Sequence, residues 1–330
     1  MADQKLRWGI LSTAKIGVKS VIPAIQQSQN GVVAAIASRD ARSAQQAAKS
    51  LGLPHAFGSY EALLESPEVD AVYNPLPNSM HKEWTVRAAE RGKHILCEKP
   101  FALNVAEVDE MIAAAKQHRV VLMEAFMYRF HPQYDKVREL IASGAIGALQ
   151  VIRSAFCFRL EDFSNIRLRK ELGGGALMDV GCYCVNVSRL VAGAEPVGVQ
   201  ASAVFGEKSQ VDETLTGILR FPNNVIGHFD ASFRTGFRSW VELQGTEGRL
   251  ELERPFLSHQ VGGIGKIVVH RADDTREEFA TRAANHYQLM AEHFADAVLK
   301  GQPLRYPPEL DRGNMRVIDA LYESARSIRE

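Results

Sequence analysis

The first 126 residues alternate short apolar segments with helical ones, and this alternation limits the possible folds more than any other feature of the sequence. Apolar strands that alternate with helices of this length favour a parallel sheet covered by helices on both faces, with right-handed crossovers. We therefore expect an α/β domain over residues 1–126. The expected strands span residues 6–11, 32–37, 69–73, 95–97 and 120–123.

From residue 127 onward, strands follow one another directly. Turn signals such as Asn223-Asn224 and Gly245–Gly248 link consecutive strands, which favours an antiparallel sheet. We expect a second α/β domain over residues 127–330, with a large, mostly antiparallel open sheet whose free face packs against another subunit. The expected strands span residues 148–158, 197–205, 215–221, 225–233, 240–244 and 266–270, and helices span 133–143, 176–191, 286–299 and 308–328.

The composition argues against several classes of partner. The 39 basic and 39 acidic residues balance, so nothing in the net charge favours nucleic acid or an anionic membrane. No apolar run approaches the roughly 18 residues that span a bilayer, and the polar segment Met1–Arg7 does not resemble a signal peptide. Cys97, Cys157, Cys182 and Cys184 lack metal-ligand spacing, so we expect reduced thiols, a cytoplasmic location and no metal site.

The turn after the first strand is a candidate phosphate-binding turn. A dinucleotide fingerprint would place glycine at positions 12, 14 and 17, and this sequence has Ser12, Ala14 and Gly17 there. Serine and alanine are small enough for a tight turn, and the helix behind it offers free N–H groups to phosphate. We expect cofactor contacts from Ser12, Thr13, Ala14, Lys15 and Ile16; an ordinary strand-to-helix turn is the alternative.

The residues after the second strand bear on which cofactor is used. An NAD-specific fold usually places a carboxylate here for the ribose hydroxyls, whereas this chain has Ser38-Arg39, and Asp40 comes slightly late. Guanidinium matches the geometry of phosphate oxygens, so Ser38 and Arg39 favour NADP over NAD, with Arg42 as a possible helper.

Two loops are expected at the carboxyl edge of the parallel sheet, where open α/β sheets bind ligands. Asn74–Asn78 contains two prolines and forms a rigid wall of a cofactor pocket through Leu76, Pro77 and Asn78. His81 adds a polar group, although a solvated histidine is the simpler interpretation.

The second loop follows the apolar run that begins at Ile95. Pro100 should end that strand, leaving Glu98 and Lys99 at its carboxyl end. The alternative is a solvated ion pair on a connecting loop.

The stretch Gly173–Tyr183 is the second informative segment. Its three glycines predict a flexible segment that closes over a ligand, and a helix then begins at Ala176. Asp179 and Tyr183 are four residues apart and therefore share one helix face. The alternatives are that Asp179 is a first-turn acid favoured by the helix dipole and that Tyr183 is a core aromatic.

In this order, and together with Tyr128–Pro132, these segments resemble the GFO/IDH/MocA oxidoreductase family over essentially the whole chain. Tyrosine at 183, where many inositol-type members carry histidine, makes the chain similar to the branch with NADP-dependent aldose dehydrogenases and dimeric dihydrodiol dehydrogenases. The resemblance implies a Rossmann domain over 1–126 and a substrate-binding and oligomerisation domain over 127–330. It also implies a homodimer, or secondly a tetramer.

The resemblance further implies roles for particular residues. Glu98, Lys99 and Arg129 join the cofactor contacts, Lys99 lies near the nicotinamide and the reacting oxygen, and Asp179 and Tyr183 face the substrate. A free tyrosine titrates at about pH 10, and a nearby ammonium favours the phenolate. Tyr183 is therefore the expected acid/base, Lys99 its electrostatic partner, and Asp179 the residue that orients a hydroxyl or Lys99.

The expected function is hydride transfer between NADP and a sugar or polyol. One alternative is a trans-dihydrodiol dehydrogenase, because Phe156, Phe158 and Phe163 fit either kind of pocket. Another is a regulator that binds NADP(H) without turnover.

Overall fold

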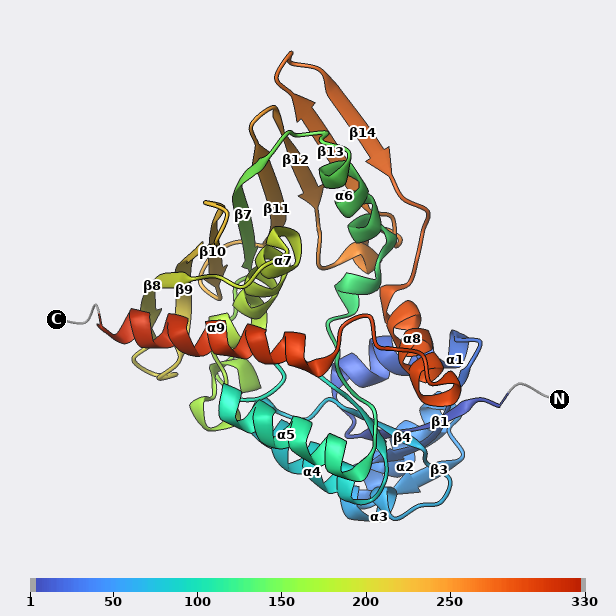
Figure 1. Cartoon of the computed structure of the whole chain (residues 1–330). Helices are drawn as coiled ribbons and strands as arrows, with labels where there is room; N and C mark the ends of the chain where they lie inside the picture. The colour runs from blue at the N-terminus through green and yellow to red at the C-terminus, as the bar shows by residue number, and fades with distance from the viewer. Residues whose placement is uncertain (1–3, 328–330) are drawn as a thin grey trace. The chain divides into compact units, whose positions relative to one another are not determined.

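The computed structural model describes residues 4–327, which form two compact units (Figure 1). Residues 4–127 and Tyr287–Arg312 form the first unit, and Tyr128–His286 with residues 313–327 form the second. The chain first passes from the first unit to the second after residue 127, whereas the sequence placed a boundary at residue 126. The later segment Tyr287–Arg312 belongs to the first unit again. The beginning of Met1–Arg7 and the end of the helix expected at 308–328 lie outside the described residues.

The first unit is built on a six-stranded sheet in the order β3-β2-β1-β4-β5-β6, with every neighbouring pair parallel. This order is the one found in dinucleotide-binding Rossmann folds and confirms the predicted parallel sheet. The strands are β1 (Leu6–Leu11), β2 (Gly31–Ala37), β3 (His55–Phe57), β4 (Ala71–Asn74), β5 (His94–Cys97) and β6 (Leu122–Glu124).

Side-chain caps begin several helices of this unit, as local sequence dictates. Asp40 accepts hydrogen bonds from the N–H groups of Arg42 and Ser43, and Asn104 accepts one from Glu107. The helices are α1 (Ile22–Gln27), α2 (Ala41–Leu51), α3 (Tyr60–Leu64), α4 (His81–Glu90), α5 (Val105–His118) and α8 (His286–Lys300), with short helices η1 (Gly17–Val21) and η2 (Asn78–Met80).

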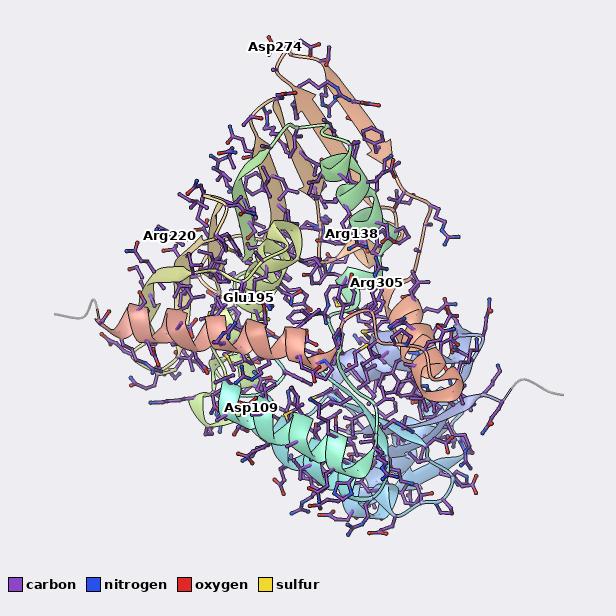
Figure 2. The ribbon with its side chains drawn as sticks, viewed as in Figure 1. Asp109, Arg138, Glu195, Arg220, Asp274 and Arg305 are labelled. Carbon is purple, nitrogen blue, oxygen red and sulfur yellow. The ribbon has the colours of Figure 1, made fainter. Side chains whose placement is uncertain are left out.

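The return of Tyr287–Arg312 to the first unit has a packing cause. Phe294 on α8 lies against Trp8 with ring centroids 5.0 Å apart, and both side chains are fully buried. Asp109 on α5, which is labelled in Figure 2, accepts two hydrogen bonds from Arg312. No local sequence pattern predicts these contacts, because the two residues of each pair lie far apart in the sequence.

The second unit contains an eight-stranded sheet in the order β14-β13-β12-β11-β7-β10-β9-β8. Every neighbouring pair is antiparallel except β10 and β7, so the predicted mostly antiparallel sheet is confirmed. The strands are β7 (Leu149–Cys157), β8 (Gly198–Phe205), β9 (Asp212–Arg220), β10 (Ile226–Ser232), β11 (Arg238–Gly245), β12 (Gly248–Glu253), β13 (Lys266–Arg271) and β14 (Arg276–Ala280).

Helices cover one face of this sheet and leave the other open (Figure 1). Along β9, Leu215 and Leu219 are buried whereas Thr216, Ile218 and Arg220 are exposed, as alternation across a one-sided sheet requires. The helices of this unit are α6 (Pro132–Ala142), α7 (Cys182–Ala192) and the main part of α9 (Pro308–Ser327), with short helices η3 (Met127–Phe130), η4 (Ile166–Leu168), η5 (Lys170–Leu172), η6 (Leu177–Gly181) and η7 (Ser258–Val261).

Three strands have no counterpart among those expected from the sequence, namely β3, β12 and β14. β3 is only three residues long, and four of the five residues of β14 are exposed on the sheet edge. Such edge strands are formed by pairing with a neighbour and carry little hydrophobic alternation of their own. Among residues 4–327, none of the helices combines the length and the apolar character that crossing a membrane would need.

Candidate active site

The carboxyl end of β5 carries Glu98 and Lys99, as predicted. The hydroxyl of Tyr73 on β4 donates to Glu98 Oε1 at 2.6 Å, and the N–H of Lys99 donates to Glu98 Oε2 at 3.2 Å. Glu98 is only 9% exposed, and its own N–H donates to the carbonyl of Asn74 at 3.0 Å. Glu98 is therefore held from the neighbouring strand, which argues against a solvated ion pair and fixes the backbone from which Lys99 projects.

His81 is fully buried, unlike the solvated histidine considered above. Its Nε2 lies 2.8 Å from the carbonyl oxygen of Leu76, and its Nδ1 lies 2.9 Å from that of Pro100. Burial lowers the pKa of the ring to about 4, although both carbonyls favour the charged form. The ring is neutral at pH 7 and has one N–H, so it donates to one of the two carbonyl oxygens and packs against the other loop. His81 therefore lies between the two predicted loops, buried at this edge of the sheet.

The turn after β1 shows the consequence of replacing glycine at position 12. Ser12 has φ +118°, a backbone conformation that L residues rarely adopt, and its Oγ accepts a hydrogen bond from the N–H of Ala14 at 3.2 Å. The N–H of Val18 donates to Ala14, so the preceding N–H groups of Lys15 and Ile16 stand at the helix start. Such N–H groups have no intrahelical acceptor and suit a pyrophosphate.

Asp40, which comes after β2, is engaged at the start of α2. Its carboxylate caps α2 through Arg42 and Ser43, and these hydrogen bonds, led by that from the Ser43 hydroxyl, lower the pKa of Asp40. Arg39 is exposed and lies beside Tyr60, where burial raises the pKa of the phenol and the guanidinium opposes the rise. The arrangement fits a cofactor that carries a 2′-phosphate.

In the second unit, Asp179 and Tyr183 lie on one continuous helical segment, η6 followed by α7. Both are buried, at 9% and 5% exposure. The η6 turn is a π-helix, a wide turn often found at functional sites. Arg167, which the sequence analysis did not single out, donates from Nε to Asp179 Oδ2 at 2.6 Å and so fixes the carboxylate.

Aromatic rings surround Tyr183. The centroids of Tyr128, Phe156 and Phe256 lie 5.8, 5.5 and 5.3 Å from that of Tyr183. Phe158 instead packs on Phe233 at 5.2 Å, and Phe163 lies beneath Lys208. Of the three phenylalanines considered for the pocket, the structure therefore brings only Phe156 into contact with Tyr183.

Gly174 and Gly175 have a steric role. A Cβ on Gly174 would lie 2.4 Å from the carbonyl oxygen of Arg167, and one on Gly175, at φ +131°, would lie 2.2 Å from Asp212 Oδ1. Glycine is needed at these two positions because the backbone passes too close to Arg167 and Asp212 to leave room for a Cβ. Asp212 had no signal in the sequence, because its partners are 35 and 110 residues away.

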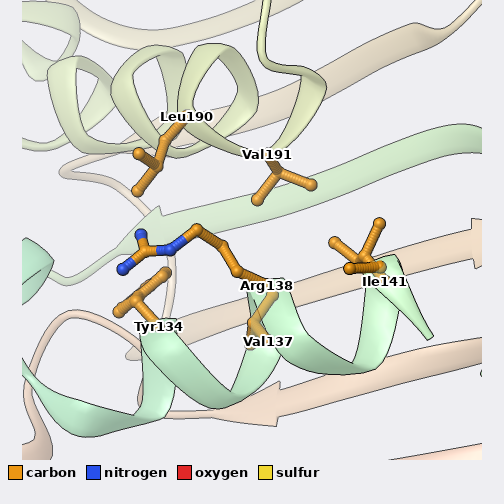
Figure 3. Close-up of a pocket in the computed structure, with 7 residues that line it drawn as sticks. Tyr134, Val137, Arg138, Ile141, Leu190 and Val191 are labelled. Carbon is orange, nitrogen blue, oxygen red and sulfur yellow. The ribbon is translucent and has the colours of Figure 1, made fainter.

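Arg129 falls in η3 of the second unit and is 2% exposed, whereas the other predicted cofactor contacts belong to the first unit. A hollow in the second unit is lined by residues other than these. It lies between α6 and α7 and is lined mainly by apolar side chains, with Arg138 across it (Figure 3). It contains none of the predicted catalytic residues.

The sheet order, the turn after β1 and the polar groups at the carboxyl edge define a dinucleotide-binding oxidoreductase fold. The chain belongs to the GFO/IDH/MocA family: a model of the oxidoreductase family with an NAD-binding Rossmann fold matches residues 6–126, and one of the GFO/IDH/MocA C-terminal domain matches residues 134–251. It is an oxidoreductase that uses a nicotinamide cofactor.

Characterised relatives match along the full length. D-xylose 1-dehydrogenase (NADP(+)) 2 of Haloferax volcanii is 41% identical over 98% of both chains. Trans-1,2-dihydrobenzene-1,2-diol dehydrogenase of Xenopus laevis is 32% identical, over 97% of this chain and 96% of that one. Among solved structures, the 3-ketoreductase KijD10 of Actinomadura kijaniata, in complex with NADP and TDP-benzene, has a TM-score of 0.91 at 29% identity, with 97% and 98% of the two chains covered.

Proposed function

We propose that this protein is an NADP-dependent dehydrogenase that oxidises a carbinol of a sugar, with an aldose as the first candidate. The observation that carries the proposal is the hydrogen bond from Arg167 on η4 to Asp179, which lies on the helical segment that also carries Tyr183. A fixed carboxylate beside a phenolic acid/base suits a substrate with several neighbouring hydroxyls. The 41% identity to a D-xylose dehydrogenase supports the same substrate class.

In the proposed reaction, the nicotinamide supplies the hydride chemistry. Tyr183 takes the proton from the substrate hydroxyl as the hydride leaves, and returns it in the reverse direction. Lys99 favours the phenolate form of Tyr183 by its charge. Asp179, held by Arg167, accepts a hydrogen bond from a second hydroxyl and so orients the carbon that reacts.

The other predicted residues are assigned to cofactor binding. Lys15 and Ile16 at the helix start, with the small residues before them, hold the pyrophosphate, and Ser38 with Arg39 holds the 2′-phosphate. Leu76, Pro77 and Asn78 form a wall, while Glu98 and His81 keep the loops in place. Arg129 completes this set from the second unit.

A trans-dihydrodiol substrate is the second candidate, and the aromatic side chains around Tyr183 favour it. Phe156 is 7% exposed and stacks on the fully buried Phe256 at 5.5 Å with an interplanar angle of 18°. An aromatic ring held in this way suits a planar ring as well as the apolar face of a sugar. A regulator that binds NADP(H) without turnover is the third candidate.

Steady-state turnover decides between these candidates. We expect NADP⁺-dependent oxidation of at least one aldose in a panel of pentoses, hexoses and trans-dihydrodiols, with the reverse reaction measured on the matching carbonyl compounds. Turnover of dihydrodiols alone would replace the first candidate by the second. Absence of turnover in a preparation that binds NADPH would favour the regulator.

Replacing Arg39 by Ala tests the cofactor assignment. Loss of a charge-assisted hydrogen bond to the 2′-phosphate costs about 1.5–3 kcal/mol, so we expect the Kd for NADP⁺ to rise on the order of tenfold or more. The Kd for NAD⁺ should not change. Lys49→Ala, at the far end of α2, is the matched control for loss of a cation. Equal binding of NADP⁺ by Arg39→Ala and the wild type would refute the role of Arg39.

The open face of the large sheet is the proposed surface for a homodimer, with a tetramer as the second possibility. Val204, Ile218 and Ile226 on neighbouring strands of that face are 65%, 42% and 45% exposed. We expect Ile218→Asp to lower the mass measured by light scattering, and Val197→Asp, outside the strands, to leave it unchanged. A cytoplasmic location is also proposed, since the four cysteines are buried thiols rather than disulfides.

A further inference from the structure

The helix that carries Asp179 and Tyr183 begins against a buried carboxylate from another part of the second unit. Asp212, the first residue of β9, is 1% exposed, and its Oδ2 accepts a hydrogen bond of 2.7 Å from the N–H of Leu177. Leu177 opens the η6 turn. A carboxylate at this position satisfies N–H groups that a helix start leaves without partners and is favoured by the helix dipole.

The second oxygen of Asp212 is held from α9. The hydroxyl of Tyr322 donates to Asp212 Oδ1 at 2.7 Å, and Gly175 passes so close that the same oxygen would lie 2.2 Å from a Cβ there. Both oxygens are therefore committed, one to the start of the η6 turn and one to α9. The carboxylate cannot rotate without breaking one of these hydrogen bonds.

A second contact from α9 reaches the same helical segment. Asn314 donates from Nδ2 to the carbonyl of Cys182 at 3.3 Å, and its Oδ1 lies 3.5 Å from Asn186 Nδ2. The η6 turn, which contains Asp179, is thus held at its first residue through Asp212 and just beyond its last residue by Asn314. Tyr183 directly follows Cys182.

We propose that Asp212 and Tyr322 are positioning residues for the reaction, because together they fix the start of the helix that presents Asp179 and Tyr183. The proposal rests on the proposed function, since those two side chains must be the ones that meet the substrate. Neither Asp212 nor Tyr322 touches the reacting atoms. A displacement of about 1 Å at a reacting group is enough to slow catalysis on the order of a hundredfold.

Titration of the pair offers an additional readout. Burial raises the pKa of Asp212 to about 6, against the opposing hydrogen bonds from Leu177 and Tyr322. Besides Asp212, two titratable groups face Tyr322: the guanidinium carbon of Arg326 lies 5.6 Å from the ring centroid, and the Cys182 thiol lies on the helical segment with Tyr183. Removing the Tyr322 hydroxyl removes a donor to the carboxylate, so the pKa of Asp212 should rise further and the acidic limb of kcat should move to higher pH.

The kinetic test compares Tyr322→Phe with Ser324→Ala. Ser324 is on the same helix and accepts a hydrogen bond from Ala201 on β8 at 3.0 Å, away from Asp212. We expect Tyr322→Phe to lower kcat on the order of tenfold, with the substrate KM and NADPH binding within about twofold of wild type. Ser324→Ala should retain the wild-type kcat. An equal loss of kcat in both variants would mean that α9 has only a general structural role.

Asp212→Asn and Asp212→Ala form the conservative series. Asparagine keeps an acceptor for the Leu177 N–H but lacks the negative charge, so it should lose kcat as a protonated Asp212 does, but less than alanine, which lacks the acceptor as well. Hydrogen exchange of peptides covering residues 176–183, measured on the full-length protein without substrate, tests the positioning separately from the reaction. Faster exchange there in Tyr322→Phe, but not in Ser324→Ala, is expected, and unchanged exchange would overturn the proposal. If the wild type turns over no sugar or diol, the proposed function fails while the exchange result still decides the positioning role.

Discussion

Tyr183→Phe should reduce turnover on the order of a hundredfold or more while NADPH still binds, because the variant lacks the hydroxyl that exchanges a proton with the substrate. Its ring remains packed among Tyr128, Phe156 and Phe256, so the fold should be retained. Steady-state kinetics with NADP⁺ and the best aldose, together with fluorescence titration of NADPH, separate loss of chemistry from loss of binding.

Tyr134→Phe is the matched control. Tyr134 belongs to the same group of aromatic residues, 4.9 Å from Tyr128, and its hydroxyl lies 3.4 Å from the carbonyl oxygen of Pro255. It should keep nearly wild-type turnover. If Tyr183→Phe did as well, the acid/base assignment would be wrong.

Lys99→Ala should have an effect of similar size on turnover, since it removes the charge that is proposed to favour the phenolate. Lys82→Ala, which breaks an ion pair with Glu110 on α5, is its control in the same unit. If Lys99 served only cofactor affinity, its replacement would raise the KM for NADP⁺ and leave kcat near the wild-type value at saturating NADP⁺.

Gly175→Ala should destabilise the protein by about 3 kcal/mol, the largest effect on stability that we expect from a single methyl group. The new Cβ would meet Asp212 Oδ1 at 2.2 Å and the Tyr322 hydroxyl at 2.8 Å, and the backbone has φ +131°. Relief requires movement of the Asp212–Tyr322 pair, so activity should fall as well. Urea unfolding followed by circular dichroism measures the change in free energy.

Gly193→Ala controls for the backbone conformation. Gly193 ends α7 with φ +63°, and nothing lies within 4 Å of a Cβ placed there. Gly193→Ala should lower the free energy of unfolding by about 1 kcal/mol, which is the cost of placing alanine in a left-handed backbone conformation. A loss in Gly175→Ala no larger than this would show that the contacts with Asp212 and Tyr322 impose no steric demand.

Several features of the fold follow from local sequence. The alternation of apolar and helical segments predicts the parallel sheet, and Pro100 marks the end of the strand that leads to Glu98 and Lys99. The four-residue spacing of Asp179 and Tyr183 predicts that they share a helix face. These predictions depend on backbone propensity and side-chain periodicity, which neighbouring residues determine.

Other features of the site could not be predicted from the sequence, because they depend on contacts between segments that meet only in the folded protein. The pairing of Arg167 with Asp179, the burial of His81 between two loops, and the role of Gly175 require knowledge of which segments meet in space. No local sequence pattern distinguishes Asp212 or Tyr322 from other acids and tyrosines. Asp212 binds Leu177, 35 residues away, and Tyr322, 110 residues away, so its role depends on contacts made only in the folded chain.

Short-range sequence patterns suffice for the two-part α/β plan and for choosing the residue types that are proposed to carry the chemistry, since both are encoded over short distances along the chain. Tertiary structure decided the strand order, the return of Tyr287–Arg312 to the first unit, and the support beneath the helix that bears Tyr183. Long-range packing selects those contacts, and its free energy is distributed over residues that are close only in the folded protein.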